Sequence, residues 1–208
     1  MIDNLNEVKM KLEYRYRLRR NRMDNENMAV ALLSEQLALA CGYGTKKTAQ
    51  IKIAAGLHDI GKNRICPKIL GKAGKLTDQE FQQMKMHTVY GADYLSAIPM
   101  ELGESGELAI EVALLHHEKY DGSGYWGYKA SALPRYIGIV SICDVLVALI
   151  SPERAYKPPW TLDEALQYIV DQAGKQFCPE LVNIFVSLIS GIRRNNGVSE
   201  IFNFGLSA

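Results

Sequence analysis

Apolar residues recur at helical spacing along most of the chain, and only residues 136–142, rich in isoleucine and valine, resemble a strand. That stretch belongs to a longer apolar pattern over about 134–150, so we interpret it as part of a buried helix. Capping boxes, in which a threonine and a glutamate three residues later satisfy the first amides of a helix, begin at Thr77 and Thr161. Apolar residues make up 48% of the 208, enough for a substantial core. These features predict an all-α fold, a single bundle of about seven or eight helices.

Glycines, prolines and capping residues divide the chain into predicted helices and loops. We expect helices over about residues 5–22, 25–41, 46–58, 77–95, 106–117, 134–150, 161–174 and 179–193. Residues 63–76 contain Pro67, Gly71 and Gly74 and are expected to form a loop. A second loop is expected at 121–127, where we interpret the glycines and the aspartate as shaping the backbone rather than binding a ligand.

The first 22 residues form a basic segment of their own. Between Lys9 and Arg22 the chain has seven basic residues and one acidic residue, Glu13. We therefore divide the chain into a basic amphipathic helix at 1–22 and a single domain at 23–208. The basic helix is interpreted as a solvated face that packs on the domain or on a second copy, which would give a homodimer. Contact with nucleic acid or an acidic partner is the alternative.

Charge, cysteine spacing and hydropathy argue against several classes of protein. The net charge is +1, so no global field points to nucleic acid. The four cysteines include no CxxC pair, so neither a zinc knuckle nor a disulfide framework is indicated. No apolar run reaches the roughly 20 residues that span a bilayer, and the N-terminus has no apolar targeting segment. We expect a cytoplasmic protein without membrane contact.

Residue types that bind metals gather near the ends of predicted helices. Each of the four histidines stands beside another candidate ligand or on a clearly capped helix: His58, His87, His116 and His117. Imidazole nitrogen binds zinc, iron, manganese and nickel, whereas carboxylate oxygen suits harder ions and can bridge two metals. Asp59, which follows His58 at the end of a predicted helix, is therefore placed to bridge two ions.

A second aspartate, Asp144, lies within the apolar pattern of residues 134–150. A buried carboxylate is costly unless it meets a cation or strong donors. Each observation has a simpler explanation when taken alone: a His-Asp pair can be incidental, one of two adjacent histidines can cap a helix, and Asp144 can pair with a buried arginine. Taken together, the residues predict one site that holds two metal ions.

The ordered set of motifs resembles the HD superfamily of metal-dependent phosphohydrolases and, within it, the HD-GYP group. The matching segments are LHDIGK (57–62), GKAGKLTDQEF (71–81), MKMHTVYGA (84–92), LLHHEKYDGSGY (114–125), CDVLVALISPERAYK (143–157) and LDEALQYIVDQAGKQFCPELV (162–182). The resemblance covers roughly residues 25–190. It implies an all-α HD-domain bundle with two metals, sometimes three, and a phosphodiesterase that opens cyclic di-GMP.

The resemblance also implies a set of ligands and cofactors. One divalent ion would be held by Asp59, His87, His116 and His117. The other would be held by His58, Asp59, Asp144 and one further ligand. Iron or manganese would be the leading ions, with zinc, nickel and magnesium as alternatives.

The chain departs from the family pattern at positions near the expected site. The family's histidine on the helix before the HD pair aligns with Glu26, which either binds the first ion through oxygen or is a solvated carboxylate at a helix start. Arg22 occupies the position of a glutamate used by three-metal members, so no third ion is expected. The GYP tripeptide reads Gly-Tyr-Trp at 124–126, and Val147 replaces an aspartate that contacts substrate. These departures weaken the indication of cyclic di-GMP more than that of the metals.

The expected reaction is hydrolysis of a cyclic dinucleotide, with cyclic di-GMP as the leading candidate. Two ions about 3.5–4 Å apart would share a hydroxide that attacks phosphorus in line with the leaving oxygen. Asp59 and Lys62 are the predicted catalytic residues, and Lys62 would stabilise charge on the phosphoryl oxygens. An exposed lysine after a helix end is the alternative for Lys62. The predicted substrate contacts are Lys62, Tyr125, Arg154 and Lys157, the last two by resemblance.

Two other functions stay open. One is a related phosphohydrolase that acts on another nucleotide or phosphoester, which Trp126 and Val147 favour. The other is a non-catalytic member that binds a nucleotide or a partner protein, which the missing histidine at position 26 favours.

Overall fold

The computed structural model describes residues 23–129, 132–152 and 158–194. The predicted basic helix at 1–22 and the predicted substrate contacts Arg154 and Lys157 lie outside the described residues. The α-helices are α2 (Met23–Ala40), α3 (Thr45–Leu57), α4 (Pro67–Leu70), α5 (Asp78–Ser96), α6 (Pro99–Leu102), α7 (Gly106–Leu115), α8 (Arg135–Ile150), α9 (Leu162–Asp171) and α10 (Pro179–Arg194). Two 3₁₀ helices are η1 (Ile60–Arg64) and η2 (Gly103–Ser105).

The described part of the chain is built from helices and contains no strand, only an isolated bridge between Ala173 and Phe177. The predicted all-α fold is therefore confirmed. The stretch at 136–142 lies inside α8 and is helical, as the continuity of the apolar pattern predicted. Both capping boxes, at Thr77 and Thr161, are present with both of their reciprocal hydrogen bonds. None of the described helices combines the length and apolar character needed to span a bilayer.

Two one-turn helices occur where the sequence predicted none. The predicted loop at 63–76 is wrong in part, because it contains the end of η1 and the whole of α4. Helix α6 was likewise not predicted. Both α4 and α6 begin with a proline, whose fixed φ and missing N–H suit the first position of a helix. Helices this short carry no apolar periodicity, so the sequence pattern cannot indicate them.

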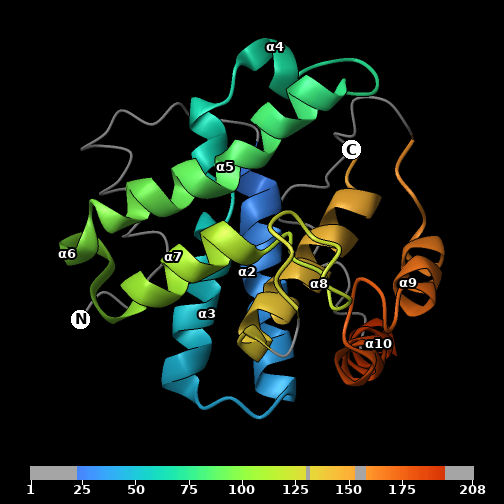
Figure 1. Cartoon of the computed structure of the whole chain (residues 1–208). Helices are drawn as coiled ribbons and strands as arrows, with labels where there is room; N and C mark the ends of the chain where they lie inside the picture. The colour runs from blue at the N-terminus through green and yellow to red at the C-terminus, as the bar shows by residue number, and fades with distance from the viewer. Residues whose placement is uncertain (1–22, 130–131, 153–157, 195–208) are drawn as a thin grey trace.

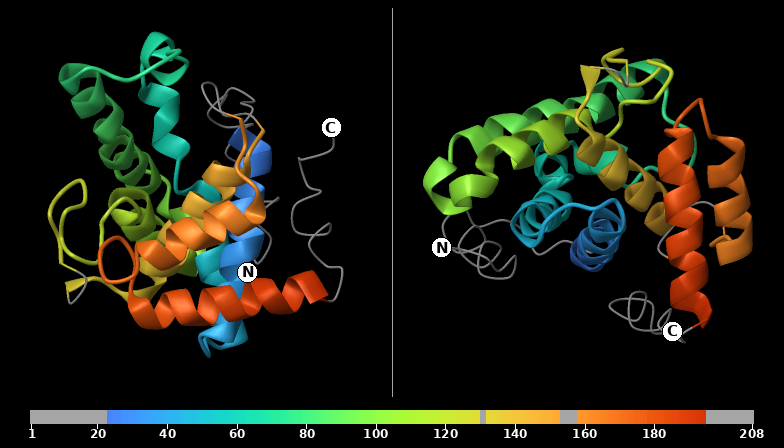
Figure 2. Two further views of the ribbon diagram at one scale, coloured as in Figure 1. Left: turned by 90° about the vertical axis from the view of Figure 1, so that its right-hand side faces the viewer. Right: turned by 90° about the horizontal axis from the view of Figure 1, so that it is seen from below.

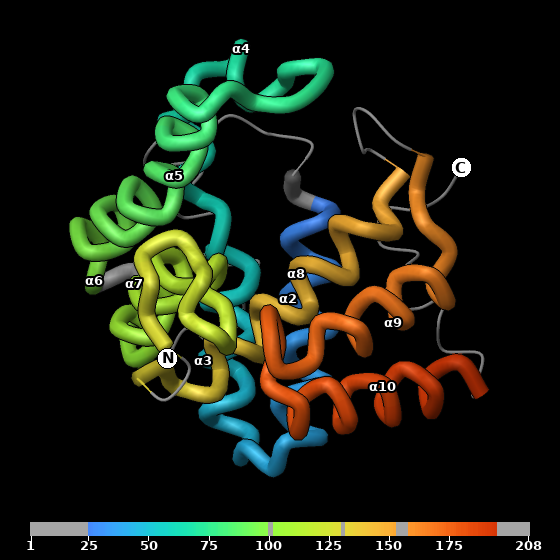
Figure 3. The backbone as a smooth tube through the Cα atoms, turned by 45° about the vertical axis from the view of Figure 1, so that its right-hand side comes forward, coloured from blue at the N-terminus to red at the C-terminus, as the bar shows by residue number. Residues whose placement is uncertain are grey.

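Helices α2 and α3 are antiparallel neighbours at the centre of the molecule, joined by a turn in which Gly42 has a φ of 84° (Figure 1). Helix α8 packs on α2, helix α7 packs on α3, and α5 packs along α7. The views in Figures 2 and 3 place α5 and α7 on one side of this pair and α9 and α10 on the other. The interior is apolar, with Leu33, Leu37, Ile51, Ile142 and Phe185 fully buried.

A backbone contact between η1 and α5 fixes the distance between two of the predicted ligands. A Cβ atom at Gly61 would lie 1.9 Å from the carbonyl oxygen of His87 and 2.4 Å from the amide nitrogen of Gly91. Only glycine permits so close an approach of the two backbones. Asp59, which immediately precedes η1, is thereby held beside His87 of α5.

Candidate metal centre

Four elements bring their predicted ligands to one buried place. His58 follows the last turn of α3, His87 lies in the middle of α5, His116 follows the last turn of α7, and Asp144 lies within α8. The side chains of His58, His87 and His116 are almost completely buried, each 1% exposed or less. The predicted convergence of segments far apart in the chain is therefore observed.

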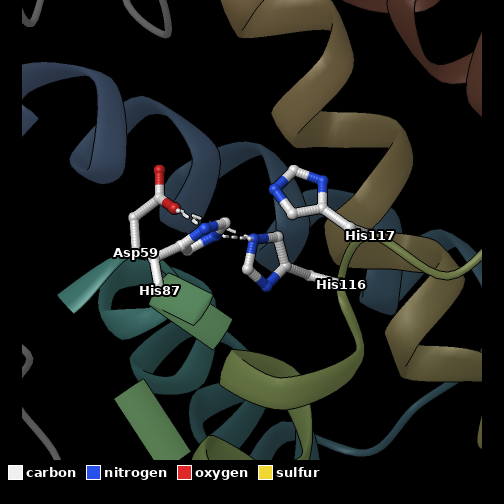
Figure 4. A group of neighbouring side chains, drawn as sticks. All are labelled: Asp59, His87, His116 and His117. Atoms are coloured by element: carbon white, nitrogen blue, oxygen red, sulfur yellow. Dashed lines mark hydrogen bonds and ion pairs between the residues drawn. The ribbon is translucent and has the colours of Figure 1, made fainter. Parts of the chain in front are cut away.

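The first group of side chains lies to one side of Asp59, with one carboxylate oxygen directed towards His87 (Figure 4). Its Oδ1 lies 3.3 Å from Nε2 of His87 and 3.7 Å from Nε2 of His116. Candidate ligand atoms of Asp59, His87, His116 and His117 all lie within 4.8 Å of one another. The resemblance implied these same four residues for one ion.

The second group lies on the other side of Asp59. Nε2 of His58 is 3.3 Å from Oδ2 of Asp59 and 3.4 Å from Oδ1 of Asp144. Candidate ligand atoms of His58, His116 and Asp144 also lie within 4.8 Å of one another. Asp59 thus faces both groups, one oxygen to each, which is the arrangement of a bridging carboxylate. The resemblance implied His116 for one ion only, whereas the structure places a nitrogen of His116 in both groups.

Helix carbonyls set the direction of three imidazole rings. Nδ1 of His58 is 2.6 Å from the oxygen of Ala55, and Nδ1 of His87 is 2.7 Å from the oxygen of Met84. Nδ1 of His116 is 3.0 Å from the oxygen of Val112. Because a carbonyl only accepts, each Nδ1 must carry the hydrogen, and in the neutral ring each Nε2 is left with a lone pair.

Within the part of the chain that the structure describes, no hydrogen-bond donor faces these lone pairs. Nε2 of His87 and Nε2 of His116 are 3.4 Å apart, and in this tautomer neither can donate to the other. Among the described residues, Nε2 of His58 and Oδ1 of Asp59 are buried polar atoms without a hydrogen-bond partner. Orphaned acceptors of this kind are costly. A cation satisfies all of them, so the donor set fits a divalent metal.

Burial keeps three of the histidines neutral. It lowers the pKa of His87, lowers that of His116 well below its usual value, and lowers that of His117 to about 4. A neutral imidazole is the form that binds a metal. The lone pairs are therefore available over the whole physiological pH range.

The carboxylates create a strongly negative spot beside His58 and Lys62. Burial alone would lower the pKa of His58, but Asp59 and Asp144 raise it to about 10. Lys62 hydrogen-bonds Oδ2 of Asp59, and although burial opposes it, this carboxylate raises the pKa of Lys62. Lys62 and His58 in turn hold the pKa of Asp59 well below its usual value, against the effect of burial. The two carboxylates therefore stabilise positive charge on His58 and Lys62.

Glu26 lies near the centre but in neither group of candidate ligand atoms. Its carboxylate accepts a hydrogen bond from the hydroxyl of Ser151, and its charge contributes to the raised pKa of Lys62. It is therefore close enough to act on the site electrostatically. Val147, in place of the family's substrate-contacting aspartate, is buried.

The loop after the histidine pair, residues 118–128, folds back over His117. Tyr125, a predicted substrate contact, lies with its ring centroid 4.5 Å from that of His117, at an angle of 35°. A Cβ at Gly124 would be 2.5 Å from Cα of Glu118, and the carboxylate of Asp121 accepts a hydrogen bond from the amide of Ser123 at 2.8 Å. The interpretation that glycine and aspartate shape this loop is consistent with both contacts.

Sequence reasoning missed Glu118, Thr88 and the contacts of Trp126. Glu118 is 4% exposed, and its two oxygens accept hydrogen bonds from the backbone amides of Trp126, at 2.7 Å, and Tyr128, at 2.8 Å. The indole N–H of Trp126 donates to the hydroxyl of Thr88 at 3.2 Å. The sequence feature that could have indicated Glu118 is its position, directly between the histidine pair and a glycine-rich loop.

Helices from distant parts of the chain close around two adjoining His/Asp groups, and Asp59 faces both of them. They define a helical protein whose donor set is suited to divalent metals. The chain matches the HD domain family over residues 9–181, and it belongs to that family.

Known proteins with similar sequences are phosphodiesterases of cyclic dinucleotides. The chain is 37% identical over 182 residues to the cyclic di-GMP phosphodiesterase response regulator RpfG of Xanthomonas campestris pv. campestris, covering 87% of this chain and 46% of that protein. It is 39% identical over 158 residues to 3'3'-cGAMP-specific phosphodiesterase 2 of Vibrio cholerae, covering 76% of this chain and 30% of that protein. The chain therefore spans less than half the length of these relatives.

A solved structure supports the fold. Bd1817, an HDG"Y"P protein from Bdellovibrio bacteriovorus, superimposes with a TM-score of 0.66 at 17% sequence identity, over 91% of this chain and 65% of that one. At this level of identity the likeness concerns the arrangement of the helices alone.

Proposed function

We propose that the chain is a metal-dependent phosphodiesterase of the HD-GYP type that hydrolyses a cyclic dinucleotide, with cyclic di-GMP as the leading substrate. The observation that carries this proposal is the position of Asp59. Its Oδ2 faces His58 and its Oδ1 faces His87, so the carboxylate lies between two groups of candidate ligands that share only His116. The names of the relatives point to the same class of substrate.

In this proposal one ion is held by Asp59, His87, His116 and His117. The other is held by His58, Asp59 and Asp144, with His116 within reach of both. When bound, two such divalent ions supply an activated water near neutral pH and neutralise charge on the phosphoryl oxygens. Iron or manganese is proposed because mixed nitrogen and oxygen donors suit them; zinc and nickel fit the same donors.

Lys62 and Tyr125 are proposed to meet the phosphodiester. The side chain of Lys62 is 25% exposed and remains cationic beside Asp59, so its ammonium can pair with a phosphoryl oxygen. Burial raises the pKa of Tyr125 to about 12, so its phenol stays protonated and can donate a hydrogen bond. The charges of Lys62, Asp59 and Asp144 all act on this phenol, so Tyr125 lies within electrostatic reach of the centre.

A second candidate substrate is the mixed dinucleotide cyclic GMP-AMP. It is favoured by the buried Val147, which cannot hydrogen-bond a base or ribose, and by the name of one relative. A cytoplasmic location and a homodimer formed through residues 1–22 remain predictions.

The test is metal analysis combined with hydrolysis of cyclic di-GMP and cyclic GMP-AMP. The protein should hold about two ions per chain. Asp59→Asn, which keeps the shape of the side chain but removes its charge, should lose metal and at least about 100-fold of the activity. Asp93→Asn, on an exposed position of α5, is the matched control and should behave as the unaltered protein. Full activity of Asp59→Asn, or no metal in the unaltered protein, would refute the proposal.

A further inference from the structure

His117 differs from the other three histidines in what sets the direction of its ring. His58, His87 and His116 each bond a helix carbonyl through Nδ1, whereas within the described residues no protein group hydrogen-bonds the ring of His117. His117 lacks such a bond because α7 ends before it: His116 is the C-cap, and His117 lies beyond the helix and its carbonyls. Its imidazole is therefore held by aromatic packing alone.

Of the rings around His117, that of Tyr125 is the most nearly parallel to it, with an interplanar angle of 35°. The Tyr125 and His117 centroids are 4.5 Å apart, and the centroid of the His116 ring lies 4.1 Å from that of His117. Two other side chains confine Tyr125. The ring of Phe81 packs edge-on against it, with the two centroids 5.7 Å apart, and Nζ of Lys85 lies 5.4 Å from the Tyr125 centroid. Because the two rings pack on each other, a movement of the Tyr125 ring would allow the His117 imidazole to change its orientation.

The next residue, Trp126, ties this part of the loop to two fixed points. Its backbone N–H donates to Glu118 at 2.7 Å, directly after the histidine pair. Its indole N–H donates to the hydroxyl of Thr88 at 3.2 Å, directly after His87 on α5. Thr88 is fully buried and Glu118 nearly so, which makes both of them rigid partners. A proline at position 126 could form neither bond, because it has no backbone N–H and no indole.

We propose that Trp126 is a positioning residue: its two hydrogen bonds hold Tyr125 against His117 and thereby aim the His117 imidazole at the metal centre. The role requires no direct contact between Trp126 and substrate. It rests on the proposed function only in that His117 binds an ion, and it is independent of which dinucleotide is hydrolysed.

The first test removes the indole hydrogen bond from either end. Trp126→Phe keeps a ring and the backbone N–H, and Thr88→Val keeps the shape of the side chain without its hydroxyl. Each should weaken the apparent affinity for Mn²⁺ by about 2- to 10-fold, the effect of one lost hydrogen bond. Because both changes remove the same bond, the double variant should be no weaker than the worse single variant. Tyr128→Phe, an exposed ring on the same loop, is the control and should leave the affinity unchanged.

The second test needs no activity and does not depend on the Thr88 variant. The chain has two tryptophans, so Trp160→Phe leaves Trp126 as the only tryptophan, which can be excited at wavelengths that the tyrosines do not absorb. Its emission should change on titration with Zn²⁺, and the further change His117→Ala should abolish that response while other ligands still bind metal. An identical response with and without His117, or unaltered Mn²⁺ affinity in Trp126→Phe, would overturn the positioning role. If the unaltered protein instead binds no metal, the proposed function fails first.

Discussion

At the scale of single residues, the orientation of the histidines depends on which nitrogen of each ring bonds the backbone. Helix carbonyls three or four residues earlier take the Nδ1 hydrogens of His58, His87 and His116. The Nε2 atoms therefore point inwards before any ion arrives, and burial keeps the His87 and His116 rings neutral by lowering their pKa values. Metal binding then requires little rearrangement of these side chains.

Lys62 gives a prediction at this scale. Lys62→Gln removes the ammonium beside Asp59 but leaves every candidate ligand in place. We expect kcat to fall by about 100-fold, because a cation near the phosphoryl oxygens is lost, while the metal content stays near that of the unaltered protein. Turnover measured alongside elemental analysis separates the two effects. Lys68→Gln, on an exposed turn of α4, serves as the control. Loss of metal in step with activity would show that Lys62 supports the ligands instead.

At the scale of elements, the contact between η1 and α5 determines how far apart the ligands stand. The two backbones touch at Gly61, where even a methyl group would overlap the carbonyl of His87. The η1–α5 contact therefore acts on metal binding through the main chain.

Gly61→Ala should accordingly damage both stability and the site. We expect a loss of about 1–3 kcal/mol or more in the free energy of unfolding, because α5 must move away from η1. Metal binding should weaken with it. Gly191→Ala, at a position in α10 with open space around it, is the matched control and should be neutral or stabilising by about 0.5–1 kcal/mol. Denaturant unfolding with and without Mn²⁺ measures both effects; equal behaviour of the two variants would contradict the role of the contact.

The long helices and the residues that gather at the centre could be predicted from sequence because each has a local signal. Apolar spacing and the Thr77 and Thr161 capping boxes indicate helices, and the order of the His and Asp motifs indicates the ligands. What escaped prediction has no local signal. The one-turn helix α4 is too short for periodicity, and the bond from Trp126 to Thr88 joins residues 38 apart in sequence. Such contacts become visible only once α5 and the loop 118–128 are placed together.

At the scale of the whole molecule, the centre brings together residues from helices that are far apart in the chain. Its residues come from α3, α5, α7 and α8, whereas α9 and α10 lie on the far side of the central pair (Figure 3). An ion held there binds the folded chain and not the unfolded one, so it must stabilise the fold.

Removal of metal should therefore lower the melting temperature. At a free metal concentration 100 times the Kd, the stabilisation is about 2.7 kcal/mol, which corresponds to a Tm shift of about 5–10 °C for a domain of this size. Calorimetry of chelated and Mn²⁺-loaded protein measures it. Asp59→Asn should lose most of the shift and Asp93→Asn should keep it. A shift of the same size in both variants would indicate binding of the metal elsewhere.

The contact at Gly61 also bears on how such a protein can change over generations. Because the spacing from Asp59 to His87 is set by two main chains in contact, it does not depend on the size of the surrounding apolar side chains. Substitutions can accumulate in the hydrophobic interior without drawing the ions apart. Glycine must be retained at position 61, because any side chain there would overlap the carbonyl of His87.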